Sequence, residues 1–433
     1  VKRITKITRP CSACTDGGVE VQEWIYDLAN GYITSMIDPA GKVWTYQHDP
    51  ITADVTGVTD PEGRTTTYTY DEFGRILTES GPGGSSTTYV QSGAGPTSIT
   101  VAASPANRTT TIEYHTENDA RKGKVKKITD PLQGETVLTY TTATGDLATV
   151  VDPLGNTTTF AYDELAIIAN RGLPTSVTDA LDKVTRTTYD TRGRVIRVTA
   201  DDGTFTTIGY NLAGRRSTVT DPMGRRTRYL YDDYSRLRAV IDPMNKATSY
   251  DYDMMGNLLA LTDANLQITR FEYENHNRVK RMIYPGGAFE QFTYDTRGRL
   301  ATVVDRKNVT TTFTYDDIGR LTQKSFSGGT TPSVNYTYND AARTSTASNG
   351  TDTLTWAYSP AGDLLSETSA TNGSTVAYQY DAGGNRVEVK LDGTLFVEYA
   401  YDDASRLESI TRGTNSYGFG YDIANRRTSM SYP

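Results

Sequence analysis

The chain has 433 residues and a formal net charge of −8, and only 36% of its residues are hydrophobic. Tyrosine supplies 30 residues, against 10 Phe and 3 Trp. Because Tyr suits a pleated surface that touches apolar neighbours and water, this composition favours a large, partly solvated sheet over a thick, dry core. The acidic balance without a basic run excludes the electrostatic footprint of a nucleic-acid binder. No stretch approaches the roughly 18 apolar residues of a membrane span.

The N-terminal segment begins at Val1 on a strand-like phrase and without Met, so we expect a piece of a longer protein. Cys11 and Cys14 follow as a Cys-x-x-Cys pair, which the repeats described below do not explain. Such a pair is typical of a local or intermolecular disulfide, of unpaired thiols, or of a metal or redox site, and the sequence leaves these readings open. With no second Cys pair and no nearby His, an intrachain four-ligand zinc site is not expected.

Asp-Pro-x-Gly quartets punctuate the chain, for example Asp38-Pro-Ala-Gly41, Asp60-Pro-Glu-Gly63 and Asp221-Pro-Met-Gly224. Asp in the first position, Pro in the second and Gly in the fourth favour a type I turn. The Asp side chain accepts backbone N–H groups, and Gly takes the left-handed conformation that completes a bulged hairpin. We call these the Asp-Pro turns.

The N-terminal part is less regular than the rest. The segments 81–86 and 92–96 are rich in Gly, Ser and Pro and are predicted to be loops. The segment 164–175 also departs from the repeat and contains the apolar patch 165–169. For this segment a longer loop between two strands is favoured over a short plug or helix. We therefore predict one continuous repeat array with a divergent segment, 1–180, and a regular segment, 181–433.

The strongest pattern is Tyr-Asp-x-x-Gly-Arg-Leu, which recurs every 21 residues from Tyr189 to Tyr315 and less strictly as far as Tyr421. A fixed period in this range is typical of an array whose units stack on their neighbours. Each unit holds one such Tyr-Asp turn and one Asp-Pro turn, so the unit is a hairpin and the chain is an antiparallel meander. The motif residues expected to be structural are Tyr189, Asp190, Gly193, Arg194, Tyr231, Asp232, Tyr294, Asp295, Gly298, Arg299, Tyr315, Asp316, Gly319 and Arg320.

Side chains recur in register along this array. Aromatic residues two apart, such as Phe292 and Tyr294, share one face of a strand and should form rows across the sheet. Rows of like charge would repel, so each Arg is expected to lie near an Asp or to stack on a Tyr. About 20 repeats give about 40 strands and, at ~4.8 Å per strand, a sheet ~190 Å wide. Twist and exposed edges favour coiling, either in one turn roughly 60 Å across or in several tighter turns.

These motifs strongly resemble the YD repeats of the RHS family, which also occur in Tc-toxin C components and in teneurins. The resemblance covers most of the chain and rests on both turns recurring at the family's period. It implies an all-β fold in which tandem 21-residue hairpins form one continuous antiparallel sheet, coiled into a hollow shell or tube. In bacterial members the shell encloses a C-terminal toxin, and in teneurins a similar shell serves cell–cell adhesion.

One family property is not carried over. Bacterial members finish the shell with a core motif resembling Pro-x-x-x-x-Asp-Pro-x-Gly-Leu, where self-cleavage frees the toxin. Nothing like it follows Tyr421, and Asp152-Pro-Leu-Gly155 continues with Asn156 where the motif has Leu. We therefore expect neither autoproteolysis nor a toxin domain within these residues.

The functional hypotheses follow from the resemblance. The first is the structural shell of a secreted RHS-type protein that encapsulates and helps deliver a C-terminal effector; its partner is that effector or a neighbouring chain of a larger assembly. The second is an extracellular structural or adhesive fibre that binds a cell-surface glycan or receptor. A carbohydrate-active enzyme is the weakest, because Asp recurs wherever a turn needs it.

No enzyme activity, cofactor or metal site is expected. His48, His115 and His276 are far apart and are predicted to be surface or turn substitutions. The segment 251–256 superficially resembles a calcium loop, but the repeat explains its residues.

Overall fold

The structure is a computed structural model that describes residues 5–10, 19–103, 106–163, 172–329 and 331–433. These residues form a single 39-stranded sheet and one short 3₁₀ helix, η1 (Pro82–Gly84). The all-β prediction is confirmed. Cys11, Cys14 and the apolar patch 165–169 lie outside the described residues. No helix in the described part of the chain is long and apolar enough to cross a membrane.

The N-terminal strands are β1 (Lys6–Pro10), β2 (Val19–Tyr26), β3 (Ile33–Ile37), β4 (Val43–His48), β5 (Val55–Thr59), β6 (Thr65–Tyr70), β7 (Ile76–Ser80), β8 (Ser86–Gln91), β9 (Pro96–Val101), β10 (Arg108–Tyr114), β11 (Val125–Thr129), β12 (Glu135–Tyr140), β13 (Leu147–Val151) and β14 (Thr157–Tyr162). The middle strands are β15 (Pro174–Thr178), β16 (Val184–Tyr189), β17 (Val195–Thr199), β18 (Phe205–Tyr210), β19 (Arg216–Thr220), β20 (Arg226–Tyr231), β21 (Leu237–Ile241), β22 (Ala247–Tyr252), β23 (Leu258–Thr262), β24 (Ile268–Tyr273) and β25 (Val279–Ile283). The C-terminal strands are β26 (Phe289–Tyr294), β27 (Leu300–Val304), β28 (Thr310–Tyr315), β29 (Leu321–Phe326), β30 (Val334–Asn339), β31 (Thr344–Ser348), β32 (Thr353–Tyr358), β33 (Leu364–Ser369), β34 (Thr375–Tyr380), β35 (Arg386–Leu391), β36 (Thr394–Tyr401), β37 (Leu407–Arg412), β38 (Asn415–Tyr421) and β39 (Arg427–Ser431).

Every strand pairs antiparallel with the next strand in the chain, as in the β18–β19 and β19–β20 pairs. In the unit from Tyr210 to Tyr231 the sequence predicts strands at 215–220 and 225–231, and β19 and β20 confirm both to within one residue. In the divergent part the two predicted loops, 81–86 and 92–96, are each one residue shorter than expected, because β8 begins at Ser86 and β9 begins at Pro96. The predicted boundary near 180 stays a prediction, because the sheet runs through this region without interruption.

The two kinds of turn share one backbone geometry, which the Asp side chain organises. In the Asp-Pro turn at 221–225 the Gly224 amide donates to the Asp221 carbonyl (2.9 Å), and the Asp221 carboxylate accepts from the backbone N–H groups of Met223 and Arg225. Gly224 has φ +77°, which costs a glycine little. The predicted type I turn with a left-handed fourth residue is therefore confirmed.

The sheet is one layer thick and has almost no buried core. Among the described residues, Ala239 is the one hydrophobic side chain classed as buried, at 8% exposure. Most strand residues are half-buried, since each contacts its neighbours on the same face. Stability must therefore come from the backbone ladder and same-face pairs, as the composition predicts.

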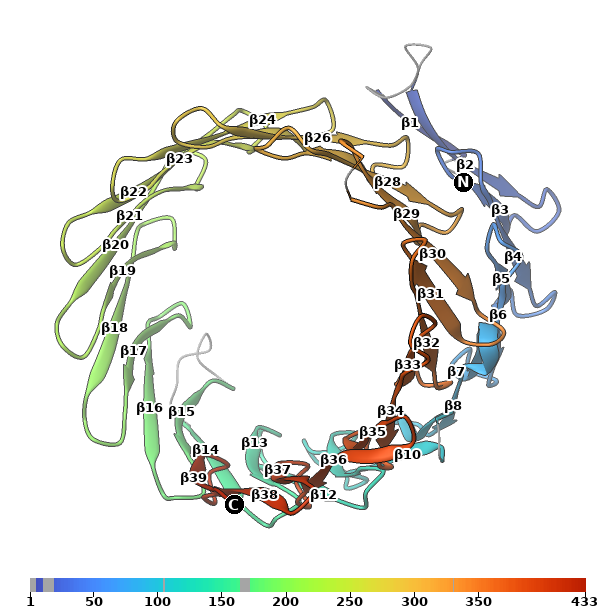
Figure 1. Cartoon of the computed structure of the whole chain (residues 1–433). Coiled ribbons are helices and arrows are strands. Elements are labelled where there is room, and N and C mark those ends of the chain that lie inside the picture. Colours follow the sequence, from blue (N-terminus) through green and yellow to red (C-terminus); the bar gives the residue numbers. More distant parts are fainter. Residues whose placement is uncertain (1–4, 11–18, 104–105, 164–171, 330) are drawn as a thin grey trace.

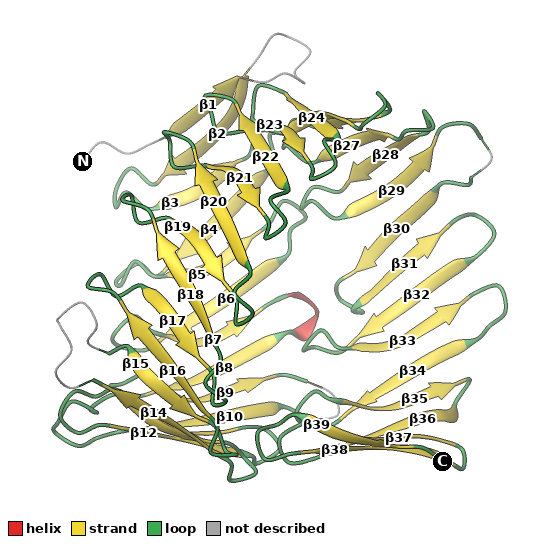
Figure 2. Ribbon diagram, turned by 90° about the vertical axis from the view of Figure 1, so that its left-hand side faces the viewer, coloured by secondary structure: helices red, strands yellow, loops and turns green. Residues whose placement is uncertain are grey.

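The sheet coils beyond one full turn, so that the chain overlaps itself (Figures 1 and 2). In Figure 1 the strands encircle a central space, and the C-terminal strands from about β28 onward return alongside the N-terminal ones. Contacts between the two coils join residues 255 to 276 positions apart. The number of turns that the sheet makes around its central space therefore lies between the single wide turn and the several tight turns that the sequence analysis considered.

Candidate functional site

The repeat motif builds a three-residue clamp. Arg194 Nε donates to Asp190 Oδ2 (2.8 Å) within one Tyr-Asp turn, and the Arg194 guanidinium stacks on the ring of Tyr210 in the next repeat (4.3 Å to the centroid). The hydrogen bond from Arg194 is the main cause that lowers the pKa of Asp190 to about 2. We call this arrangement the Asp–Arg–Tyr clamp.

Six repeats stack the turn arginine on the next repeat's tyrosine, and the expectation that each Arg lies near an acid or stacks on a Tyr is confirmed for them. The stacked pairs are Arg194–Tyr210, Arg236–Tyr252, Arg278–Tyr294, Arg299–Tyr315, Arg320–Tyr338 and Arg406–Tyr421. Each Arg also pairs with the acidic residue four positions before it. The alternation of charge and ring removes the repulsion that rows of like charge would create.

The motif tyrosines also tie neighbouring strands together. Tyr252 Oη donates to the Leu237 carbonyl (2.9 Å), 15 residues earlier, and Tyr294 and Tyr315 make the same bond to Val279 and Leu300. This constant offset places the tyrosines in one row. His48 substitutes for the motif tyrosine and contacts the Ile33 carbonyl through Nε2 (2.8 Å).

The second structural feature is a seam, where Asp-Pro turns and neighbouring residues of the N-terminal coil (38–156) meet Tyr-Asp turns of the C-terminal coil (295–426). Ion pairs bridge it: Arg297–Asp38 (2.6 Å), Lys42–Asp317 (2.5 Å), Arg320–Glu62 (2.7 Å), Arg64–Asp340 (2.8 Å) and Arg108–Asp363 (2.9 Å). Two further hydrogen bonds extend it, since Arg343 donates to the Gly83 carbonyl and Asn425 Nδ2 donates to the Asp152 carboxylate (3.1 Å).

The densest part of the seam is a network around Asp340. Arg64 from the N-terminal coil and Arg320 from the preceding repeat both donate to its carboxylate. Burial alone would raise the pKa of Asp340, but these two arginines outweigh it and the pKa is lowered. Asp340 is therefore held ionised between the coils.

The Tyr-Asp turn at 359–363 reverses the usual chemistry. Ser359 stands in the Asp position and Asp363 in the Arg position, and the Ser359 hydroxyl donates to Asp363 Oδ2 (2.8 Å). Ser359 is 2% exposed. The missing cation comes from the other coil, because Arg108 donates to both Asp363 oxygens (3.1 and 2.9 Å).

The structure does not gather the predicted motif residues into one centre. Those at 189–194 and 231–232 lie in the stretch covered by a single coil, whereas those at 294–299 and 315–320 lie at the seam. Sequence reasoning missed the seam partners Arg108, Asp340 and Asp363. The reversed motif at 359–363 was a usable signal, since an unpaired acid in the Arg position requires a cation from elsewhere.

The three histidines have separate environments. His48 and His276 are half-buried, and His276 lies in a turn as predicted. His115 begins a turn, which is one of the two predicted settings, but it is buried at 8% exposure; its Nδ1 contacts Glu117 Oε2 (3.0 Å) and its ring packs edge-on against Tyr140. In the described ranges no three His, Cys, Asp or Glu side chains converge as metal ligands.

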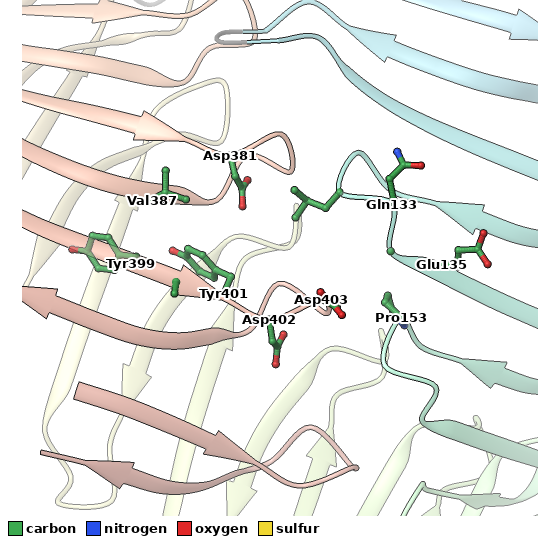
Figure 3. A pocket seen from close by; sticks show the side chains of 12 residues that line it. Gln133, Glu135, Pro153, Asp381, Val387, Tyr399, Tyr401, Asp402 and Asp403 are labelled. Carbon is green, nitrogen blue, oxygen red and sulfur yellow. The ribbon is translucent and has the colours of Figure 1, made fainter. Parts of the chain in front are cut away.

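A cleft of about 680 Å³ opens in the seam (Figure 3). The N-terminal coil contributes Leu132, Gln133, Gly134, Glu135 and Pro153, and the C-terminal coil contributes Asp381, Val387, Tyr399, Ala400, Tyr401, Asp402 and Asp403. In Figure 3 Asp381 and Asp403 lie beside the gap, whereas the Tyr401 side chain points back along its own wall, away from Gln133 and Pro153. We call this cavity the seam cleft.

Comparison with known proteins agrees with this geometry. A family model described as Teneurin YD-shell matches residues 175–311, and the RHS Repeat model matches residues 54–87, 294–331 and 358–394. No curated protein matched the sequence.

Two solved structures are similar in fold. The crystal structure of TcdB2-TccC3-TEV matches with a TM-score of 0.58 at 13% sequence identity. The match covers 96% of this chain and 31% of the chain in that structure. The structure of the Photorhabdus luminescens Tc holotoxin pore matches with a TM-score of 0.53 at 13% sequence identity. The match covers 98% of this chain and 28% of the chain in that structure. This chain therefore spans less than a third of either structure's chain.

The coiled hairpin array with its clamps and seam defines a YD-repeat β-shell. The two family models agree with it, since they identify RHS repeats and a YD-shell segment within this array.

Proposed function

We propose that this chain is part of the structural wall of a secreted RHS-type protein, and that the complete shell encloses and helps to deliver an effector that lies outside residues 1–433. The action is steric and not catalytic: a continuous β-surface separates the enclosed polypeptide from its targets. The Tc-toxin complexes that share this fold support the proposal by analogy of architecture.

The observation that carries the proposal is the self-overlap of the sheet. In a hairpin array that stays open the turns face solvent, whereas here the turns of the second coil dock on the first coil through the seam ion pairs. Such docking turns a ribbon into a wall around a central space (Figure 1). A wall of this kind suits confinement better than it suits a substrate pocket.

The test is electron microscopy of the native, full-length gene product. Discrete hollow particles with internal density, whose enclosed segment resists protease until the wall is opened, would support encapsulation. Long tubes of uniform width would refute it and favour the alternative below.

The alternative is an extracellular structural or adhesive fibre, with a glycan or receptor as ligand. One observation favours edge-to-edge assembly: large apolar side chains stand at the turn tips of the singly coiled stretch. Met223, Met244, Leu212 and Leu266 are each more than three-quarters exposed. Apolar tips of this kind are typical of contact surfaces.

A further inference from the structure

The clamp provides an internal template for binding a guanidinium. In six repeats an Arg side chain lies between the acidic residue of its own turn and the Tyr of the next repeat. Two repeats in the described part of the chain keep the Asp and the following Tyr but carry Asn in the Arg position. These are Asp253–Asn257–Tyr273 and Asp381–Asn385–Tyr401. Asn is too short to stack on the tyrosine ring, and in both repeats its Nδ2 instead donates to the next turn, Asn257 to Asn277 Oδ1 (2.9 Å) and Asn385 to Ser405 Oγ (3.3 Å).

The second of these incomplete clamps lies at the seam cleft. Asn385 reaches back to Asp381 (Nδ2 to Oδ2, 3.0 Å), and both Asp381 and Tyr401 line the cavity. Tyr401 keeps the usual bond from its hydroxyl to the Arg386 carbonyl (3.1 Å), so the ring has the orientation that it has in complete clamps. Within the described ranges no cation stacks on it.

Four carboxylates line the cleft, and the nearby Arg386 directs its guanidinium to the rings of Tyr378 and Tyr399. Glu135 is paired with Lys127, and Asp402 is paired with Arg406. Asp403 is exposed and makes no ion pair with any described residue. The guanidinium of Arg108 lies against Gly384 in the turn at 381–385, and it pairs there with Asp363.

The incomplete clamp at 381–385 lies at the seam, so the N-terminal coil forms a second wall opposite it. The turns before it are bridged by Arg297, Arg320, Arg343 and Arg108, whereas no charged bridge joins the turns 130–134 and 381–385 among the described residues. Leu132 and Pro153 instead face the incomplete clamp from the other coil. Asn257 has no such cover, because its turn lies in the singly coiled stretch.

We propose that the seam cleft binds the arginine side chain of a partner polypeptide, with the guanidinium stacked on Tyr401 and held by Asp381 and Asp403. The planar fork of Arg fits this stack and these acceptors better than the ammonium of Lys. At about 680 Å³ the cleft exceeds the needs of one guanidinium and lies within the range of about 300–1,000 Å³ typical of ligand sites, leaving room for flanking peptide.

The experiment is calorimetric titration of the intact chain with the peptide acetyl-Gly-Arg-Gly-amide and with its neutral citrulline counterpart. We expect saturable binding of the Arg peptide and at least about tenfold weaker binding of the citrulline peptide, because the charge-assisted bonds are lost. N385R, which completes the clamp from within, should weaken binding at least about tenfold, and so should D403N, an exposed substitution. N257R is the matched control and should leave binding unchanged.

Equal binding of the two peptides, absent binding to the unaltered chain, or unchanged binding by N385R would overturn the inference. An equal loss in N257R would also overturn it, because the effect would then reflect net charge and not this site. The inference is independent of encapsulation: hollow particles without peptide binding would refute only the cleft, and binding by tubular material would refute only the shell proposal.

Discussion

Removing Arg108 tests whether the seam closes through specific charge pairs. R108M keeps the length of the side chain but leaves the Asp363 carboxylate with the Ser359 hydroxyl as its side-chain partner. The two side chains are 17% and 15% exposed, so the pair is largely desolvated. Breaking a buried pair costs about 3–5 kcal/mol and an exposed one about 0–1 kcal/mol, so we expect about 2–3 kcal/mol here.

The assay must be local, because a repeat array of this length does not unfold in one step. The Gly362 and Asp363 amides both bond to Ser359 and report opening of this turn by hydrogen exchange. A loss of 2–3 kcal/mol corresponds to exchange that is faster by about 30- to 150-fold.

Two controls make the test specific. D363N relieves the unpaired charge, so the double variant R108M/D363N should lose less than the sum of the single losses, by about 1–2 kcal/mol. R225M removes an arginine that is 64% exposed and outside the seam, and it should change local stability by no more than about 0.5 kcal/mol. Additive losses, or equal effects of R108M and R225M, would refute a specific inter-coil pair.

Three further predictions concern the repeat itself. G298V should destabilise its hairpin by about 1–2 kcal/mol more than G224V. Both glycines have positive φ, but only a Cβ at position 298 would collide with an arginine, Arg278. Equal losses of stability in the two variants would show that this collision has no effect. Y252F should cost about 1 kcal/mol of local stability by hydrogen exchange, since a carbonyl loses its donor; unchanged exchange would contradict this. Asp190 has a lowered pKa, so its stabilisation is complete above its ordinary value of 3.8 and is lost as the pH falls through about 2. R194Q should return the pKa toward 3.8 in a carboxyl NMR titration, and an unmoved value would exclude Arg194 as the main cause.

The sequence was sufficient for everything that one hairpin decides by itself. The Asp at the start of each turn, the Gly in its fourth position and the 21-residue period predicted the strands near residue accuracy. The contact between Arg and Asp or Tyr followed from the need to relieve like charges in register. These features are local, and each is repeated many times.

The length of one coil could not be predicted, because twist and strand tilt accumulate over many strands before the ribbon meets itself. The contacts that then form use positions that vary between repeats, such as Arg297 and Glu62. No period marks those positions. The seam cleft was missed for the same reason, since Asn385 becomes informative only when the opposite wall is known.

The regular turns form locally, whereas the irregular positions contact the other coil, and this difference explains how a repetitive sheet reaches one defined coil. A turn with Asp, Gly and Arg satisfies its own charges, so it forms within a hairpin and is indifferent to the neighbouring coil. The turn at 359–363 differs, because among the described residues its carboxylate forms an ion pair only with Arg108 of the first coil. A register in which Arg108 faced another repeat would leave the Asp363 carboxylate without this arginine. The exceptions to the repeat, and not the repeat, therefore select the register in which the shell closes.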